Sequence, residues 1–292
     1  MTSVVIAAHN EGAGIGRCLD ALLGEAAPGE LDVTVVANGC SDSTAAQARS
    51  HPGVRVLEID QASKPAALNA GDSVAVGFPR IYLDADIVVA TAVARALRDA
   101  LLGSEALAAY PGRTLDLAGR PPLVRAYFAI SSRLPVFRDG LFGRGMIALS
   151  GEGRARFTAF PDMVADDLYL DSLFEQSEKR LVPGVSTVVG VPLRTRDLVR
   201  RLVRVRRGNA AMREAARTGH VHAAVRPANR WSWLVDVVLP RPWLAPAAVV
   251  YVAITTWAGL VARRGDRADM TWGRDESTRT PADPGRREGR RA

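Results

Sequence analysis

Short apolar runs alternate with amphipathic stretches along the first third of the chain. Four runs have the length and residue content of buried strands: Ser3–Ala8, Asp32–Ala37, Val54–Ile59 and Arg80–Leu83. Four stretches that follow them have helical periodicity: Ile15–Leu23, Ser43–Ser50, Pro65–Val76 and Ala92–Leu102. Strands that alternate with helices form a mainly parallel sheet covered by helices on both faces. The pattern therefore predicts an α/β fold.

The pattern is less regular in the middle of the chain. Gly140–Gly145 has the composition of a mobile loop, Met146–Ser150 is a candidate strand, and Asp167–Glu178 is a candidate helix. A very basic helical region follows at Thr195–Arg217. We expect this region to break near Gly208, because glycine is a poor helix former.

Composition narrows the class of protein without choosing its function. The chain has 292 residues, 48% of them hydrophobic and 24% charged, which is typical of a globular protein. Its two cysteines exclude a disulfide framework and a four-cysteine zinc site, and we expect a reducing compartment. No secretory signal is recognisable at the N-terminus. The net charge of +7 is compatible with a nucleic acid, an anionic membrane or a phosphorylated substrate.

Polar clusters follow each of the four predicted strands. They are Ala8-His9-Asn10-Glu11, Asn38-Gly39-Cys40-Ser41-Asp42, the segment Lys64–Gly71 that opens the helix after the third strand, and Asp84-Ala85-Asp86. Ligands of such sheets bind at the carboxyl ends of the strands. We therefore expect the four clusters to meet at one edge of the sheet.

The paired aspartates Asp84 and Asp86 are candidate ligands of a divalent cation, because carboxylate oxygens suit Mg²⁺ or Mn²⁺. Such a cation would neutralise a departing diphosphate. Lys64, near a helix start, also suits a phosphate. The alternatives are a solvated turn for the two aspartates and a solvated surface position for the lysine.

Two residues after the second strand have separate interpretations. Asn38 could hydrogen-bond the edge of a base or a ribose. For Asp42 we favour the role of a helix cap.

The glycine-rich Gly12–Gly16 segment resembles a dinucleotide-binding fingerprint, but that motif needs glycine where this chain has Arg17. A P-loop motif is absent from the sequence. We therefore exclude hydride transfer and P-loop phosphoryl transfer.

A second acidic pair, Asp166-Asp167, lies about 80 residues beyond the aspartate pair at the fourth strand. A sugar transfer from a nucleotide donor needs a base that deprotonates the acceptor. Asp167 is the candidate base, and the like charge of Asp166 would raise its pKa. An ordinary acidic helix N-terminus is the alternative.

The order and spacing of these motifs resemble an inverting, family 2 glycosyltransferase with the GT-A fold, over residues 2–215. The resemblance implies a nucleoside site formed by Ala8, His9, Asn10, Glu11 and Asn38. It places Lys64 near the donor phosphates, and it assigns ribose and metal to Asp84 and Asp86. Ala165-Asp166-Asp167 matches the acid-pair motif of the family, whose second member is the base, so Asp167 takes that role.

The sequence departs from the family pattern in three places. Ala37-Asn38 replaces the usual aspartate pair after the second strand, and His9 replaces an aromatic residue. The Q-x-x-R-W motif of processive synthases is missing, so we infer single transfers, with Arg206 as a possible diphosphate contact. His220 and His222 are available to complete a metal shell, although an exposed loop is the favoured interpretation.

The C-terminal third is first basic and then apolar. Nine arginines fall within Arg194–Arg217, but no aromatic residues interleave with them, so we disfavour nucleic-acid binding and favour anionic lipid or donor phosphates. Leu244–Ala262 lacks charge and would form a helix of about 28 Å, close to the thickness of a bilayer core. We expect it to insert into a membrane, with an interfacial helix or a soluble packing helix as alternatives.

Together these features predict a single GT-A domain over 1–220, with a nucleotide-binding half (1–110) and an acceptor half (111–220). An apolar membrane-associated or transmembrane segment (221–262) and a disordered basic tail (263–292) follow. The expected activity is metal-dependent transfer of one sugar from a nucleotide-diphosphate donor to a hydroxyl acceptor, with lipid-linked acceptors as candidates, at the cytoplasmic face of the cell membrane. The alternatives are a non-catalytic nucleotide-sugar-binding scaffold and, disfavoured by the missing G-x-G-T-R start, a sugar-phosphate nucleotidylyltransferase.

Overall fold

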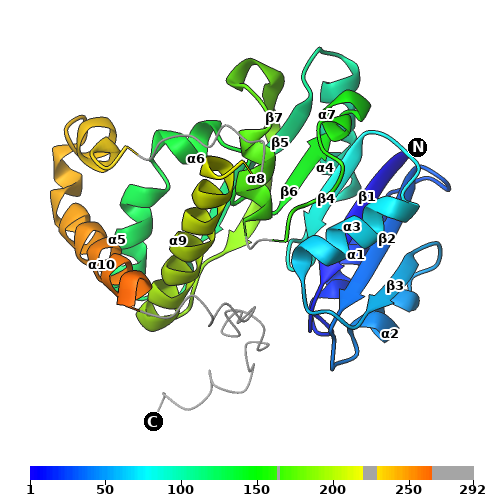
Figure 1. The fold of residues 1–292 in the computed structure, drawn as a ribbon, viewed down its shortest axis with the longest axis horizontal. Helices are drawn as coiled ribbons and strands as arrows, with labels where there is room; N and C mark the ends of the chain where they lie inside the picture. The colour runs from blue at the N-terminus through cyan, green and yellow to red at the C-terminus, as the bar shows by residue number, and fades with distance from the viewer. Residues whose placement is uncertain (163–164, 220–228, 265–292) are drawn as a thin grey trace, which may run out of the picture.

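A seven-stranded sheet runs through the molecule and is covered by helices on both faces (Figure 1). The computed structural model describes residues 1–162, 165–219 and 229–264. The strand order is β3-β2-β1-β4-β6-β5-β7, and β6 runs antiparallel to its neighbours β4 and β5. The other pairs of the described sheet are parallel. The strands are β1 (Thr2–Ala8), β2 (Leu31–Asn38), β3 (Arg55–Ile59), β4 (Arg80–Asp84), β5 (Ala108–Asp116), β6 (Met146–Leu149) and β7 (Lys179–Gly190). The mainly parallel α/β fold is therefore confirmed.

The first four strands and helices follow the hydrophobic pattern closely. The helices are α1 (Ile15–Leu23), α2 (Thr44–Arg49), α3 (Lys64–Val74) and α4 (Thr91–Leu102). Alternate residues of β1 enter different layers of the core, because successive side chains of a strand point to opposite faces. Val4 and Ile6 pack with α1 and α4, whereas Val5 and Ala7 pack with α3. Both faces of β1 are buried, as the continuous apolar run requires.

The pattern of hydrophobic residues does not reveal β5 and β7. Each strand contains a Pro-Gly pair, Pro111-Gly112 in β5 and Pro183-Gly184 in β7, and such residues normally argue against a strand. The pairing register shifts between Pro111 and Gly112, and Gly184 adopts a φ of +80° in the bulge on the opposite strand. Because β7 lies at the edge of the sheet, the bulge interrupts only one ladder.

Two helix predictions need correction. The predicted helix Asp167–Glu178 is a shorter α8 (Asp166–Ser172) followed by a separate 3₁₀ turn, η1 (Gln176–Glu178). The expected break near Gly208 is wrong, because α9 (Thr195–Arg217) continues through this buried glycine. Met212, further along α9, is fully buried in the core, and this packing outweighs the low helix propensity of one glycine.

The apolar C-terminal segment forms α10 (Ala245–Arg264), which packs on α5 (Pro122–Ser131) and α9. The remaining elements are α6 (Pro135–Asp139), α7 (Gly151–Ala155), the π-helix η2 (Trp233–Val238) and the 3₁₀ turn η3 (Pro242–Leu244). The predicted tail begins two residues too early, since Arg263 and Arg264 belong to α10. Residues 265–292 lie outside the described ranges, so the rest of that prediction stays untested.

Close packing of α3 on the sheet sets the position of Lys64. A Cβ atom at Gly71 would lie 2.4 Å from Cγ1 of Val5 and 3.2 Å from Cγ2 of Val36, so only glycine allows this approach. Ser63 caps the helix by accepting a hydrogen bond from the Ala66 N–H. Lys64, the first residue of α3, therefore starts from a fixed backbone position.

Candidate active site

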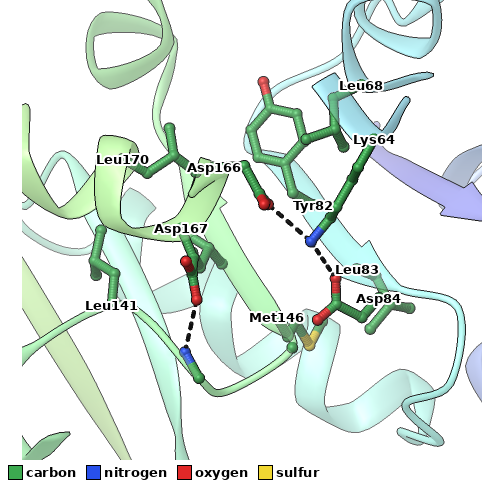
Figure 2. Close-up of a pocket in the computed structure, with 13 residues that line it drawn as sticks. Lys64, Leu68, Tyr82, Leu83, Asp84, Leu141, Met146, Asp166, Asp167 and Leu170 are labelled. Atoms are coloured by element: carbon green, nitrogen blue, oxygen red, sulfur yellow. Dashed lines mark hydrogen bonds and ion pairs between the residues drawn. The ribbon is translucent and has the colours of Figure 1, made fainter. Parts of the chain in front are cut away.

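A pocket opens where β4 ends, between α3, α8 and the loop that precedes β6 (Figure 2). Its volume is about 400 Å³, including the open mouth. The lining residues come from both predicted halves of the chain: Lys64, Leu68, Tyr82, Leu83, Asp84, Leu141, Gly143, Gly145, Met146, Ile147, Asp166, Asp167 and Leu170. The sequence-predicted residues Lys64, Asp84, Asp166 and Asp167 therefore meet in one cavity.

Lys64 lies between two carboxylates from opposite walls of this pocket (Figure 2). Its Nζ is 2.7 Å from Oδ1 of Asp84 and 2.8 Å from Oδ2 of Asp166. Burial alone would lower the pKa of Lys64, but the charges and hydrogen bonds of Asp166 and Asp84 outweigh that effect and raise it. Lys64 is therefore a permanent cation, and it allows two carboxylates to lie close together.

Asp167 faces the same pocket but makes different contacts. Its Oδ2 accepts a hydrogen bond from the backbone N–H of Gly143 at 3.0 Å, and its Oδ1 accepts one from the N–H of Leu168 at 2.9 Å. Burial, with a smaller contribution from the negative charge of Asp166, raises the pKa of Asp167 to about 6, against the opposing effect of Lys64. The predicted influence of Asp166 has the expected sign, and burial is the larger cause. The side chain can thus accept a proton near neutral pH.

Two glycines and a buried arginine shape the loop beside Asp167. Gly143 and Gly145 both have a φ of +69°, and a Cβ at Gly145 would lie 2.4 Å from Cγ1 of Ile87. The Arg144 guanidinium, only 3% exposed, donates hydrogen bonds to four backbone carbonyls: Pro111, Phe137, Arg138 and Gly140. These bonds hold the segment that we interpreted from sequence as a mobile loop. The sequence identified Gly140–Gly145 as a loop but gave no sign that Arg144 anchors it.

The expected nucleoside residues lie where β1 and β2 end. Nδ2 of Asn38 donates to the Ala8 carbonyl at 2.8 Å, and Nδ1 of His9 lies 2.6 Å from the Asn38 carbonyl. Asn38 is fully buried, and its Oδ1 has no hydrogen-bond partner in the described structure. The Asn38 side chain therefore joins the two strand ends, and its contact with a nucleoside stays a prediction.

The following loop is fixed by backbone and side-chain hydrogen bonds. Asn10 adopts a φ of +51° and its Oδ1 accepts from the Ser41 N–H at 2.9 Å, while the N–H of Glu11 donates to Oγ1 of Thr44 at 2.8 Å. The carboxylate of Asp42 accepts from the N–H of Thr44, the first residue of α2, and also from the N–H of Gly12. The N-cap residue of α2 is Ser43, so the predicted cap is off by one position, although the Asp42 carboxylate does bind the first N–H of the helix.

The predicted metal ligands are carboxylates at the end of β4. Asp84 lines the pocket and Asp86 is exposed, two residues further on. The pKa of the buried Cys18 thiol is raised to about 12, first by burial and then by the charges of Asp86, Asp84 and Glu11. These three carboxylates therefore concentrate negative charge in one region, and their oxygens suit Mg²⁺ or Mn²⁺. Within the described ranges no group of three or more His, Cys, Asp or Glu side chains is arranged to hold a metal.

Arg206 does not lie at the pocket, and the expected diphosphate contact is not supported. It lies on α9 with a guanidinium nitrogen 3.4 Å from the Cβ position of Gly259 in α10. The face of a long basic helix that meets the site depends on tertiary packing, which the sequence did not reveal. His220 and His222, the other candidates for the metal shell, lie outside the described residues.

The fold and the shared acidic pocket define a GT-A-type glycosyltransferase. The chain belongs to the glycosyl transferase family 2, whose family model matches residues 3–148, half of the chain. This assignment favours an enzyme over a non-catalytic scaffold and a glycosyltransferase over a nucleotidylyltransferase. No curated protein sequence matches the chain.

Solved structures with the same fold include three bacterial or archaeal proteins. The mannosyltransferase PcManGT from Pyrobaculum calidifontis, in complex with GDP-Man and Mn²⁺, has 20% identity, a TM-score of 0.55, and coverage of 90% of this chain and 78% of that chain. Glucosyl-3-phosphoglycerate synthase from Mycobacterium tuberculosis, with Mn²⁺, UDP-glucose and phosphoglyceric acid, has 22% identity, a TM-score of 0.53, and coverage of 75% and 80%. TarS 1–349 from S. aureus has 12% identity, a TM-score of 0.50, and coverage of 91% and 92%. At these identities the similarity establishes the fold.

The contacts of Lys64 generate a first prediction. In Lys64→Met, the carboxylates of Asp84 and Asp166 lose the cation between them, so we expect unfolding to become easier by about 1–3 kcal/mol. The loss should be fully present at neutral pH, where Lys64 is charged, and should shrink as the pH rises above the ordinary lysine pKa of 10.5, because the pKa of Lys64 is raised in the folded state. Thermal unfolding measured across pH checks this, with Lys64→Arg as the control that keeps the charge. An equal loss at every pH would contradict the ionic explanation.

Proposed function

We propose that the protein is a metal-dependent, inverting glycosyltransferase that moves a single sugar from a nucleotide-diphosphate donor to a hydroxyl acceptor. The observation that carries this proposal is the presence of Asp84 and Asp167 in one pocket, where Lys64 pairs with Asp84 and with Asp166, the neighbour of Asp167. One carboxylate belongs to a strand end where donors bind in this type of sheet, and the other begins a helix of the second half. This supports a donor side and an acceptor side in one cavity.

On the acceptor side, Asp167 takes the proton of the attacking hydroxyl. Its carboxylate is held by the Gly143 N–H, and its raised pKa brings its basicity closer to that of a neutral solution. The deprotonated oxygen attacks the anomeric carbon as the bond to the diphosphate breaks, and this single displacement inverts the configuration. Asp166 keeps Lys64 beside the base and is a positioning residue in this proposal.

On the donor side, Asp84 and Asp86 would hold a divalent cation, Mg²⁺ or Mn²⁺. When bound, the cation supplies positive charge to the departing diphosphate. Lys64 adds a second positive charge at the pocket wall, near the expected donor phosphates. Ala8, His9, Asn10, Glu11 and Asn38 are the proposed nucleoside side of the site.

The proposed division is a nucleotide-binding half over 1–110 and an acceptor half over 111–220. Its support is the pocket, to which both halves contribute residues. Among the residues that the structure describes, one helical segment, Pro242–Arg264, is by length and composition apolar enough to cross a membrane. We therefore also propose that the catalytic domain works at a membrane, on its cytoplasmic face, where a lipid-linked hydroxyl would be an accessible acceptor.

Asp167→Asn tests the catalytic base. Because a positioned general base contributes about 10²–10⁴-fold in rate, we expect release of nucleoside diphosphate from a panel of UDP- and GDP-sugars to fall by that factor. Binding of the same donor, measured by thermal shift, should change little. Asp99→Asn, on α4, is the matched control. Full turnover by Asp167→Asn would reject its role as the catalytic base. Release of nucleoside diphosphate at the same rate from every sugar donor in the panel would reject the proposed function.

The raised pKa of Asp167 gives a pH dependence. The base must be ionised, so kcat/KM should fall about tenfold per pH unit below a midpoint near pH 6 and level off above it. Asp166→Asn removes a like charge and should move this midpoint to lower pH. The measurement is the pH–rate profile of both proteins. A midpoint that stays in place or rises in Asp166→Asn would contradict the electrostatic assignment.

Asp86→Asn tests the cation site. Asparagine keeps the shape of the side chain but loses the charge, so we expect a rise of at least about tenfold in the Mn²⁺ concentration needed for half-maximal turnover. Titration calorimetry with Mn²⁺ in the presence of the preferred nucleoside diphosphate gives an independent readout. Asp60→Asn, at an exposed carboxylate that follows β3, serves as the control. An unchanged Mn²⁺ requirement in Asp86→Asn would remove this residue from the site.

A further inference from the structure

The outward side of α10 exposes large apolar side chains that have no cover in the described structure. We call this surface the outer face of α10; it consists of Val249, Val252, Trp257, Leu260 and Val261, with Trp243 just before the helix. Their exposed fractions range from 36% to 72%. The segment Pro242–Arg264 has a mean hydropathy of 1.8, and only 17% of its most apolar window is buried. Single exposed apolar residues are ordinary, but a charge-free apolar helix face is not.

The opposite side of α10 is held by the catalytic domain along the length of the helix. Ala248 packs with Ile130 of α5, Tyr251 stacks on Tyr127 at 5.2 Å between ring centroids, and Ala258 is fully buried. Contacts therefore extend from the first turn of the helix to Ala258, six residues before its end. In Figure 1, α10 is the outermost helix at the end of the molecule away from β1–β3, with α5 and α9 on its inner side.

This packing is incompatible with α10 crossing a bilayer. A spanning α10 would carry its neighbour α9 into the hydrocarbon, and α9 bears eight arginines: Arg196, Arg200, Arg201, Arg204, Arg206, Arg207, Arg213 and Arg217. Each arginine at the centre of a membrane opposes insertion, because its charge must leave water for hydrocarbon. The alternative is to strip α10 from α5 and α9, which exposes the buried stripe that includes Ala248 and Ile254.

The segment before α10 extends the same apolar surface. Trp231, Val235 and Leu239 are each more than half exposed, whereas Val237 and Val238 of η2 pack inward with α5 and α10. Three tryptophans, at positions 231, 243 and 257, are thus exposed along this end of the protein. Tryptophan rings are amphipathic and favour the boundary between hydrocarbon and headgroups.

The charged residues around the apolar surface favour a lipid membrane over a second copy of the chain as its partner. Arg230, Arg241, Arg263 and Arg264 flank the apolar surface, and Asp236 is the one acidic residue between positions 229 and 264. Two copies that met through this face would bring like charges together. An anionic bilayer instead attracts each arginine that lies near its surface.

We propose that α10 lies flat in the interface of an anionic membrane, with its outer face inserted, and does not cross the bilayer. Trp231, Trp243 and Trp257 sit at the headgroup level, and the flanking arginines contact anionic headgroups. The helix thereby fixes the catalytic domain against one side of the membrane. This goes beyond the proposed membrane location by assigning its geometry, and it does not depend on which sugar is transferred.

Vesicle binding by the full-length protein tests the lipid partner. We expect it to bind phosphatidylcholine vesicles that contain phosphatidylglycerol, to bind pure phosphatidylcholine vesicles much more weakly, and to lose binding at high salt. The double variant Trp243→Ser/Trp257→Ser should bind at least about tenfold more weakly. The control Val76→Ser/Leu102→Ser removes comparably exposed apolar side chains from other elements and should bind as the wild type does. Circular dichroism and thermal unfolding check that both variants fold.

Two outcomes would overturn the lipid assignment. Equal binding to vesicles with and without phosphatidylglycerol would show that the arginines do not contribute to membrane binding. No vesicle binding, together with a dimer that the tryptophan substitutions dissociate, would assign the face to a second copy. Since neither assay uses a donor, failure here leaves the proposed glycosyl transfer untouched, and loss of turnover in Asp167→Asn leaves the docking untouched.

Cysteine labelling tests the geometry. Pro240→Cys and Arg264→Cys place an exposed thiol just before and at the end of the apolar segment, and Cys40→Ser removes the partly exposed native thiol. With protein bound to sealed anionic vesicles, a membrane-impermeant maleimide added outside should label both positions equally. Protection of one end until detergent is added would show that the helix spans the bilayer and would refute the flat orientation.

Discussion

The ion triad formed by Lys64, Asp84 and Asp166 is the interaction on which the site depends. It joins the start of α3, the end of β4 and the start of α8, three elements that are far apart along the chain. Two carboxylates close enough to share one ammonium group would repel each other by several kcal/mol in a half-buried pocket without that cation between them. Lys64 therefore makes the acidic pocket compatible with a folded chain.

The position of the candidate base follows from the same triad. Asp166 is fixed by Lys64, and Asp167 is the next residue in the first turn of α8, so its side chain is directed toward Gly143. The raised pKa of Asp167 depends on this arrangement, because burial and the charge of Asp166 oppose ionisation while Lys64 supports it. Asp166 and Asp167 are adjacent in sequence and have the same side chain, but Asp166 pairs with Lys64 whereas Asp167 accepts a hydrogen bond from Gly143.

The sequence predicted the half of the fold in which local pattern and tertiary burial agree. The bounds of α1 agree with the predicted helix, since Ile15, Cys18, Leu19 and Leu22 form one buried stripe. The strands β5 and β7 were not predicted, because each contains a Pro-Gly pair that normally argues against a strand. The structure tolerates these pairs through a bulge at the sheet edge. Gly208 led to the opposite error: its low helix propensity predicted a break, but α9 is continuous because long-range packing stabilises it.

The candidate site was likewise predicted only in part from the sequence. Asp84, Lys64 and the Asp166-Asp167 pair could be found because their residue types and their places at strand and helix ends indicate their chemistry. The anchoring of the loop by Arg144 could not, since its partners are backbone carbonyls, which no side-chain pattern identifies. Arg206 was misplaced because a helix rich in arginine presents cations on every side.

The continuity of the sheet limits how this enzyme can move. β6 pairs with both β4 and β5, so two adjoining ladders of hydrogen bonds connect β4 to β5 through β6. A hinge between these strands would have to break one of those ladders. Any closure around substrates must therefore come from side chains and loops at the rim, while the sheet beneath them serves as a rigid floor.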